Sequence, residues 1–387
     1  MQIDPIIIPE SKKPNLFERL KVGFGKPKNR LIIIIVMVAL IIIFSTLGFY
    51  LLRRDDTITP PPTEAKNETP VVEEVKPLLY QAPLDGLMVD KENADRHPLA
   101  VIIENHVDAR PQSGLTQASV VYEAITEGGI TRFMALYGTT VAEKAGPIRS
   151  ARTYFVDWAM GYSAYLSHVG GNIDALDMIK SARVLDLDQF AYSDCSNVYC
   201  RDYSRKVALE HTMYGFPKAL YDEANRLGYQ KANNFTIYKF KDEPTVEATA
   251  TLPESQTVLV KFSSANFDVR FDYDKATNSY KRSLAGKPHL DAVTKEQITA
   301  KNVIVMSVKR EAVRTRINED GYKMTTVGSG NADIFMDGKR ITATWKKTSS
   351  GEREMFFDEN GQEIVFNRGK FWICVLPPEP GSQLTVQ

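Results

Sequence analysis

An uncharged apolar run, LIIIIVMVALIIIFSTLGFYLL at residues 31–52, constrains this chain more than any other feature. As an α-helix rising roughly 1.5 Å per residue, the run would be about 33 Å long, enough to cross the hydrocarbon of a membrane. Seven Lys and Arg residues precede the run within residues 12–30, whereas three follow it within residues 53–66. Because the more basic flank stays in the cytoplasm, the sequence predicts a cytoplasmic tail at 1–30, a single-pass transmembrane helix at 31–52 and an extracytoplasmic remainder.

A cleaved signal peptide is the alternative to a retained anchor, but the run is long and no small-residue cleavage site follows it cleanly. No cysteine lies near the run, which excludes a lipid-modified cysteine at its end. Residues 53–79 are rich in Pro, Thr and Glu and poor in aromatic residues. Such a segment buries too little apolar surface to offset its ordering entropy, so it predicts a disordered tether.

The segment 80–240 alternates short apolar runs with helical patterns. The strands are expected at 98–104, 118–124, 132–138 and 163–169, and the helices at 151–161, 173–182 and 216–228. Strands separated by helices are typical of an α/β layered domain.

The pattern changes after a loop at 241–255. Short alternating runs such as TVLVKF, NVIVMSVK and RITATWKK are separated by GSG, DGK and ENGQ, whose Asp-Gly and Asn-Gly pairs suit tight hairpins. Residues 256–378 therefore predict a mainly antiparallel β domain. The expected fold class is α+β or α/β, with a transmembrane helix and a tether before the two domains.

Two arginines in GPIRSARTYFVDWA, Arg149 and Arg152, suggest a functional site. If Ser150 caps a helix beginning at Ala151, both guanidinium groups lie near the backbone N–H groups of the first helical turn. Because the helix dipole is positive there, a compensating anion such as phosphate or carboxylate is expected. The alternative, which stays open at this point, is pairing with carboxylates inside the domain: Asp157, Glu123 or Glu127.

Other polar segments follow strands or lie in loops of the same domain, where α/β sheets tend to bind ligands. The residues expected to bind an anionic ligand together are Arg110, Arg132, Arg149, Arg152, His168, Arg201 and His211. The acidic residues that could act as acid, base or metal ligand are Glu104, Glu127 and Asp202. No catalytic residue is assigned.

The three cysteines carry no catalytic signal. Cys195 and Cys200 lie five residues apart in a polar loop, and a disulfide between them would stabilise that loop by about 2 kcal/mol. Zinc binding is less favoured, because no second ligand pair at zinc spacing lies nearby, and no metal is assigned. Cys374, in FWICVL, is expected to be a buried thiol.

Several long motifs resemble one bacterial family. They include ARPQSGLTQASVVYEAITEGGITRFMALY, GPIRSARTYFVDWA, SHVGG, the Arg201-Asp202 pair, GSGNADIFMDGKRITATWKK and GKFWICVLP. Together they cover nearly all of 82–378 and are similar to the YerB-like bacterial lipoprotein family. The resemblance implies a two-part extracytoplasmic protein of the cell envelope whose domains have no assigned function. This chain differs from that pattern in its expected membrane anchor and in the cysteines of YSDCSNVYCRD.

The expected function is binding of an anionic envelope ligand, or of an envelope protein, through the arginine and histidine cluster. The alternative is a metal-assisted phosphotransferase or hydrolase acting on a phosphorylated envelope lipid or polymer, since a single anchor with an arginine-rich ectodomain also resembles the LytR-CpsA-Psr phosphotransferases. Residues 81–387 carry 37 Lys and Arg against 39 Asp and Glu, which argues against nucleic acid as a partner. No nucleophile elbow, zinc motif or Walker loop is present, so no cofactor is expected.

Overall fold

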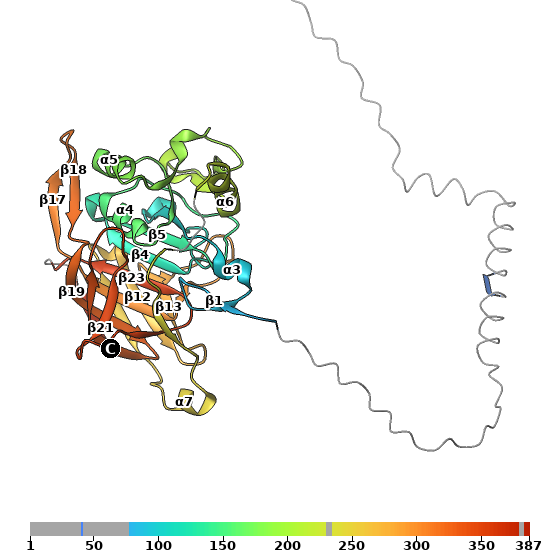
Figure 1. The fold of residues 1–387 in the computed structure, drawn as a ribbon, viewed down its shortest axis with the longest axis vertical. Helices are drawn as coiled ribbons and strands as arrows, with labels where there is room; N and C mark the ends of the chain where they lie inside the picture. The colour runs from blue at the N-terminus through green and yellow to red at the C-terminus, as the bar shows by residue number, and fades with distance from the viewer. Residues whose placement is uncertain (1–39, 42–76, 230–233, 379–382) are drawn as a thin grey trace, which may run out of the picture. The chain divides into compact units, whose positions relative to one another are not determined.

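The computed structural model describes residues 40–41, 77–229, 234–378 and 383–387. From residue 77 onward the main element is a ten-stranded sheet that takes strands from both halves of the sequence (Figure 1). In spatial order its strands are β21 (Met355–Asp358), β20 (Lys339–Lys347), β19 (Gly328–Met336), β16 (Asn302–Ser307), β23 (Phe371–Leu376), β4 (Val120–Ile125), β5 (Thr131–Tyr137), β3 (Leu99–Glu104), β6 (Tyr165–His168) and β7 (Leu185–Asp188).

The centre of this sheet joins the two halves of the chain. Strand β23 pairs in parallel with β4 on one side and with β16 on the other. Every residue of β3, β4, β5 and β23 is buried. Strands covered on both faces are apolar throughout rather than at alternate positions, which is why these segments are so hydrophobic.

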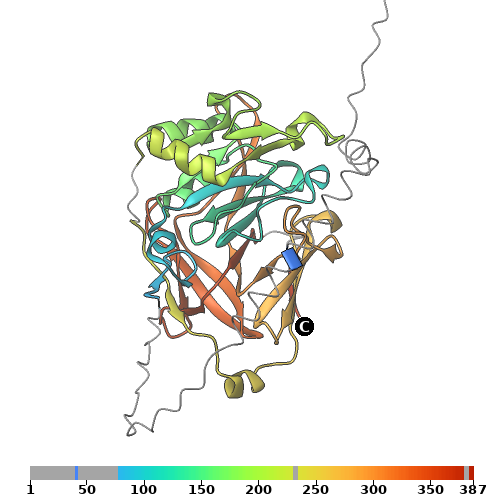
Figure 2. The ribbon, with the colours of Figure 1, turned by 90° about the vertical axis from the view of Figure 1, so that its right-hand side faces the viewer.

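Alternate side chains of the central strands enter two cores. In β3, Leu99, Val101 and Ile103 belong to the core that also holds the second sheet. Ala100 and Ile102 point the other way, into the core that holds the aromatic side chains of the helix Thr153–Met160. The large sheet is therefore a middle layer (Figure 2). One face is covered by the second sheet and the helix Pro217–Arg226, and the other by the helices Thr153–Met160 and Ile173–Ser181.

The second sheet is antiparallel and comes from the C-terminal half. Its strands are β14 (Lys287–Pro288), β13 (Ser279–Leu284), β12 (Asp268–Asp274), β11 (Thr257–Lys261) and β24 (Gln383–Val386), with β15 (Thr299–Ala300) paired to β13. Among the described residues, four two-stranded pairs complete the β structure: β1 (Tyr80–Gln81) with β2 (Met88–Val89), β8 (Tyr199–Arg201) with β9 (Met213–Gly215), β10 (Lys239–Lys241) with β22 (Val365–Asn367), and β17 (Arg310–Arg314) with β18 (Asp320–Met324).

The helices are short. The α-helices from residue 77 onward are α3 (Lys91–Asp95), α4 (Thr153–Met160), α5 (Ile173–Ser181), α6 (Pro217–Arg226) and α7 (Val246–Ala250). The 3-10 helices are η1 (Val107–Ala109), η2 (Glu127–Gly129), η3 (Gln189–Ala191), η4 (Leu209–His211) and η5 (Ala265–Phe267). Strands expected near 98–104, 118–124, 132–138 and 163–169 occur as β3 to β6, and the three expected helices occur as α4, α5 and α6.

A hairpin from the C-terminal half lies beside the helices of the N-terminal half. Strands β17 and β18 stand next to α4 and α5 in Figure 1, and Arg316 in their turn contacts Asp177 of α5 at 2.6 Å. Gly321 of β18 approaches the side chain of Asn172, which caps α5.

The expected fold class is wrong in its description of the first folded segment. The described residues form a mainly β structure, because strands of the expected α/β segment 80–240 continue into one sheet with strands of the C-terminal half. Among the described residues, no helix is both long and apolar enough to span a membrane. The predicted transmembrane helix at 31–52 lies outside the described residues except for Leu40 and Ile41, and the predicted tail at 1–30 and most of the tether also lie outside them.

Candidate anion-binding site

The segment that carries Arg149 and Arg152 lies along the end of β3. The N–H of Arg149 donates to the Ile102 carbonyl at 2.9 Å, and the N–H of Glu104 donates to the Pro147 carbonyl at 2.8 Å. The register of the neighbouring strands β3 and β5 places Glu104 opposite Arg132. Glu104, Arg132 and the segment of Arg149, which are distant in sequence, thereby lie next to one another at the end of β3.

Helix α4 begins two residues later than expected. Its first residue is Thr153 and its N-cap is Arg152, so Ser150 is not the cap. No side chain caps this N-terminus, although all but the first and last residues of α4 are buried. The uncapped N–H groups of the first turn and the dipole of the helix therefore favour an anion beside Arg152.

Both arginines of the motif have carboxylate partners. Arg149 Nε lies 3.1 Å from Glu104 Oε1, and Arg152 holds Glu127 through Nε and Nη2 at 2.7 to 3.0 Å. Of the three carboxylates considered from the sequence, only Glu127 is such a partner; Asp157 pairs with Lys347, and Glu123 with Arg282. Both arginines are thus paired with carboxylates inside the domain, Arg149 with Glu104 and Arg152 with Glu127.

Arg132 is different, because no carboxylate is paired with it among the described residues. Its side chain donates to the Ser150 carbonyl at 2.5 Å, while its Nε is buried without an acceptor. Only 5% of Arg132 is exposed. Burial, followed by the charges of Arg152 and Arg149, lowers the pKa of Arg132 to about 9. Arg149 and Arg152 are therefore paired with carboxylates, whereas Arg132 is a buried guanidinium without an ionic partner among the described residues.

Glu104 also connects the site to His211. The Glu104 carboxylate accepts a hydrogen bond from His211 Nδ1 at 2.8 Å while it contacts Arg149. Glu104, Glu127, Arg132, Arg149, Arg152 and His211 are thus brought together at the end of β3 and the start of α4.

The remaining predicted site residues have separate contacts. Arg110 donates to Asn105 and to the Asn266 carbonyl. Arg201 contacts Asp194 and donates to the Leu209 carbonyl. Asp202 accepts hydrogen bonds from the backbone N–H and hydroxyl of Ser204. Each of these residues is engaged in local structure.

His168 is a buried ion-pair residue at the end of β6. Its Nε2 lies 2.8 Å from Asp186 Oδ1 and its Nδ1 lies 2.7 Å from the Gly170 carbonyl. Burial alone would lower the pKa of His168, but the hydrogen bond to Asp186 and the charges of Asp188 and Asp186 outweigh it and raise the pKa. This side chain is wholly buried, and its bond to the Gly170 carbonyl links it to the loop after β6.

Cys195 and Cys200 form a disulfide, and Cys374 is a buried free thiol. The bridge closes the loop immediately before Arg201, and the strand β8 that contains Cys200 pairs with β9.

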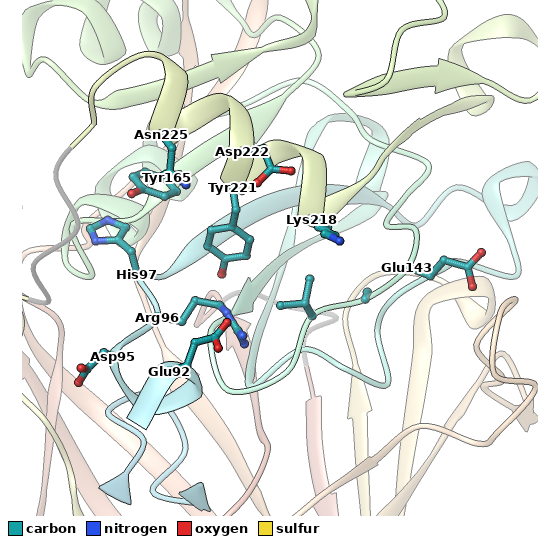
Figure 3. A pocket seen from close by; sticks show the side chains of 12 residues that line it. Glu92, Asp95, Arg96, His97, Glu143, Tyr165, Lys218, Tyr221, Asp222 and Asn225 are labelled. Carbon is teal, nitrogen blue, oxygen red and sulfur yellow. The ribbon is translucent and has the colours of Figure 1, made fainter. Parts of the chain in front are cut away.

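Two cavities are lined by helices of the N-terminal half. The larger, of about 780 Å³, opens between α3 and α6, where Tyr221 points into it and Arg96 and Lys218 lie at its sides (Figure 3). None of the predicted site residues lines this cavity. A smaller cavity of about 320 Å³ lies at the start of α4 and is lined by Thr153, Asn172, Asp174, Val313, Arg314, Tyr322 and Lys323. Sequence reasoning missed its β17–β18 wall, which comes from the other half of the chain.

Comparison with known proteins agrees with the resemblance inferred from the motifs. Residues 84–230 match the N-terminal domain, and residues 258–373 the C-terminal domain, of "Protein of unknown function (DUF3048)". The chain is 30% identical over 300 residues to "Putative lipoprotein YerB" of Bacillus subtilis (strain 168), covering 77% of this chain and 86% of that protein. The crystal structure of YerB from Bacillus subtilis matches with a TM-score of 0.69 and 27% identity, over 79% of this chain and 99% of that one.

Proposed function

Because the chain belongs to the DUF3048 family, whose domains are described as being of unknown function, we propose a function from its own geometry: it is an extracytoplasmic cell-envelope protein that binds a phosphate-bearing ligand between β3 and α4. Location at the cell envelope is supported by the similarity to YerB, which is named as a lipoprotein. The ligand class is supported by the three guanidinium groups of Arg132, Arg149 and Arg152.

The proposal depends on Arg132, which is buried and has no carboxylate partner among the described residues. A buried charge without an ionic partner is costly, and the two neighbouring guanidinium groups add repulsion. An anion at the start of α4 would relieve both effects. It would also accept hydrogen bonds from the uncapped N–H groups of the first turn, which otherwise have no side-chain acceptor.

Phosphate suits this arrangement better than a single carboxylate. Arginines bind phosphate through two parallel N–H groups, and several phosphate oxygens can contact different guanidinium groups at the same time. The cavity at Thr153 adds Arg314 and Lys323 on its far wall. A ligand with more than one phosphate could therefore extend from the arginines toward the β17–β18 hairpin.

The test compares the thermal unfolding of the purified chain in phosphate or pyrophosphate with its unfolding in chloride of equal ionic strength. A ligand at a hundred times its Kd stabilises a folded protein by about 2.7 kcal/mol, so a rise in Tm is expected. Calorimetric titration with the same two anions measures the affinity and the stoichiometry directly, with one site expected per chain.

The deciding variant is Arg132→Met, with Arg201→Met as its matched control. Arg132→Met removes the surplus charge, so without phosphate the variant should unfold at the same or a higher temperature, while the stabilisation by phosphate is lost. Arg201→Met removes an arginine paired with Asp194 and should keep the response to phosphate. An equal response to phosphate in both variants would contradict the proposal.

A further inference from the structure

A second cluster lies beside Glu104 and contains one buried imidazole, one half-buried imidazole and one exposed carboxylate. Ligand atoms of His106, Asp108 and His211 all lie within 4.8 Å of one another. His106 and Asp108 come from the turn that forms η1, and His211 ends η4. Two segments about a hundred residues apart in sequence thus supply one set of metal-ligating side chains.

The turn that carries Asp108 is held in place by the segment that leads to His211. Arg205 donates through Nη2 to the Asp108 carbonyl at 2.5 Å and through Nη1 to the Tyr214 hydroxyl at 2.5 Å. Both contributing segments are therefore positioned by backbone and side-chain bonds that do not use the ligand atoms.

His211 is oriented as metal-bound histidines usually are. Its Nδ1–H donates to the buried carboxylate of Glu104 at 2.8 Å, which leaves the lone pair on Nε2. A carboxylate behind a histidine fixes the tautomer and orientation that a metal ion requires. The Glu210 carboxylate lies 3.7 Å from that Nε2.

The distances and charges of the cluster suit a divalent ion. His106 Nδ1 lies 3.6 Å from Asp108 Oδ2, close to the separation of about 3.4 Å between tetrahedral ligands that are each about 2.1 Å from a metal. The three carboxylates of Glu104, Asp108 and Glu210 lie near two guanidinium groups: Arg149, which contacts Glu104 and Glu210, and Arg205, which donates to the Asp108 carbonyl. The excess of negative charge attracts a cation.

We propose that His106, Asp108 and His211 bind a divalent transition metal ion of the zinc and manganese class, with Glu104 as a positioning residue. Imidazole and carboxylate ligands together select such ions over calcium or magnesium. Three protein ligands leave coordination positions open for water or for an anion.

Metal binding requires the ring of His106 to turn. The rings of His106 and His211 are stacked, with centroids 4.7 Å apart and planes 2° from parallel, so their lone pairs do not meet at one point in this arrangement. The side chain of His106 is 31% exposed, and a 3.3 Å hydrogen bond from the Asp108 N–H holds its Nδ1. To bind the metal, His106 must give up this weak hydrogen bond and rotate its ring out of the stack.

The experiment uses Zn²⁺ and Mn²⁺ alone, in a phosphate-free buffer, with the full chain after treatment with a chelator. Equilibrium dialysis followed by elemental analysis should find one ion per chain. His106→Ala and Asp108→Asn should each weaken binding at least about tenfold, and Glu104→Gln should weaken it by about 10 to 100-fold through the loss of the group behind His211. Proton NMR of the imidazole groups should show that His106 leaves the stacked arrangement when the metal binds.

Matched controls test whether the bound ion occupies this cluster. Asp202→Asn removes a half-buried carboxylate that is outside the cluster, and Arg132→Met removes the centre of the anion site; both should keep full metal binding. His106→Ala should melt at the same temperature as the unaltered chain in the absence of metal. Unchanged stoichiometry and affinity in both His106→Ala and Asp108→Asn, or the absence of one-to-one binding by the unaltered chain, would overturn the proposal without affecting the test of phosphate binding.

Discussion

Arg282 and Glu123 form an ion pair at 2.8 Å in the interior although 159 residues separate them in sequence, and the side chains of both are completely buried. The Glu123 carboxylate also accepts hydrogen bonds from the Trp372 indole and the Thr131 hydroxyl. The pair therefore connects the second sheet, through β13, to the centre of the large sheet.

Loss of one member of this pair is expected to destabilise the chain strongly. Arg282→Met leaves the Glu123 carboxylate buried without its cation, which should lower the free energy of unfolding by about 3 to 5 kcal/mol. Urea unfolding followed by circular dichroism measures this loss. Arg270→Met, in a neighbouring strand but in an exposed pair with Asp272, should cost less than about 1 kcal/mol. Comparable losses in the two variants would show that the buried pair has no special role.

Acid is expected to destabilise the chain through His289. Burial, then the charges of Arg282 and Arg110, hold the pKa of His289 well below its ordinary value, so the folded protein keeps this imidazole neutral. The unfolded chain takes up a proton below about pH 6.5, and therefore stability should fall as the pH is lowered through that value. His289→Gln should reduce the dependence of the unfolding free energy on pH between 7 and 5. A dependence equal to that of the unaltered chain would contradict this assignment.

His168 is expected to change the pH dependence of stability in the direction opposite to that of His289. Its pKa is raised in the folded protein, because the bond to Asp186 and the charge of Asp188 outweigh burial. The stabilisation by this ion pair is fully present below the unfolded pKa of about 6.5 and is lost as the pH rises through the higher folded value. The difference in Tm between the unaltered chain and His168→Gln should therefore shrink between pH 6 and pH 9. A difference that stays constant over this range would mean that the histidine contributes only by packing.

Reduction of the disulfide is expected to have a modest effect. Because the Cys195–Cys200 bridge closes a short loop, dithiothreitol should lower the free energy of unfolding by about 2 kcal/mol. The double variant Cys195→Ser, Cys200→Ser should unfold like the reduced chain and should no longer respond to the reductant. A continued response in that variant would point to Cys374 or to an intermolecular bridge instead.

Local sequence patterns were sufficient for much of the secondary structure. The apolar runs at 98–104 and 132–138 form β3 and β5, and the helical pattern at 173–182 forms α5. Pairing across the two halves was not predictable in this way. Nothing in the run FWICVL indicates that β23 lies beside β4, because the register of strands far apart in sequence depends on tertiary packing.

The candidate site was predictable in part. The sequence named Arg132, Arg149, Arg152 and Glu104 as candidates, and the strand register places Arg132 opposite Glu104. Single-residue reasoning could not distinguish Arg132, whose charge is uncompensated, from Arg201, whose charge is paired with Asp194. The sequence shows His106 in the segment ENHVDAR, but it does not predict that His106 lies near His211, because that proximity depends on how η1 and η4 pack.

The position of β23 also has a consequence for biosynthesis. A ribosome releases the N-terminal half first, and β23, which pairs with β4, emerges about 250 residues after it. Until then the edge of β4 offers unpaired backbone groups to any other extended chain nearby. While β4 lacks this partner, pairing with another extended chain competes with productive folding.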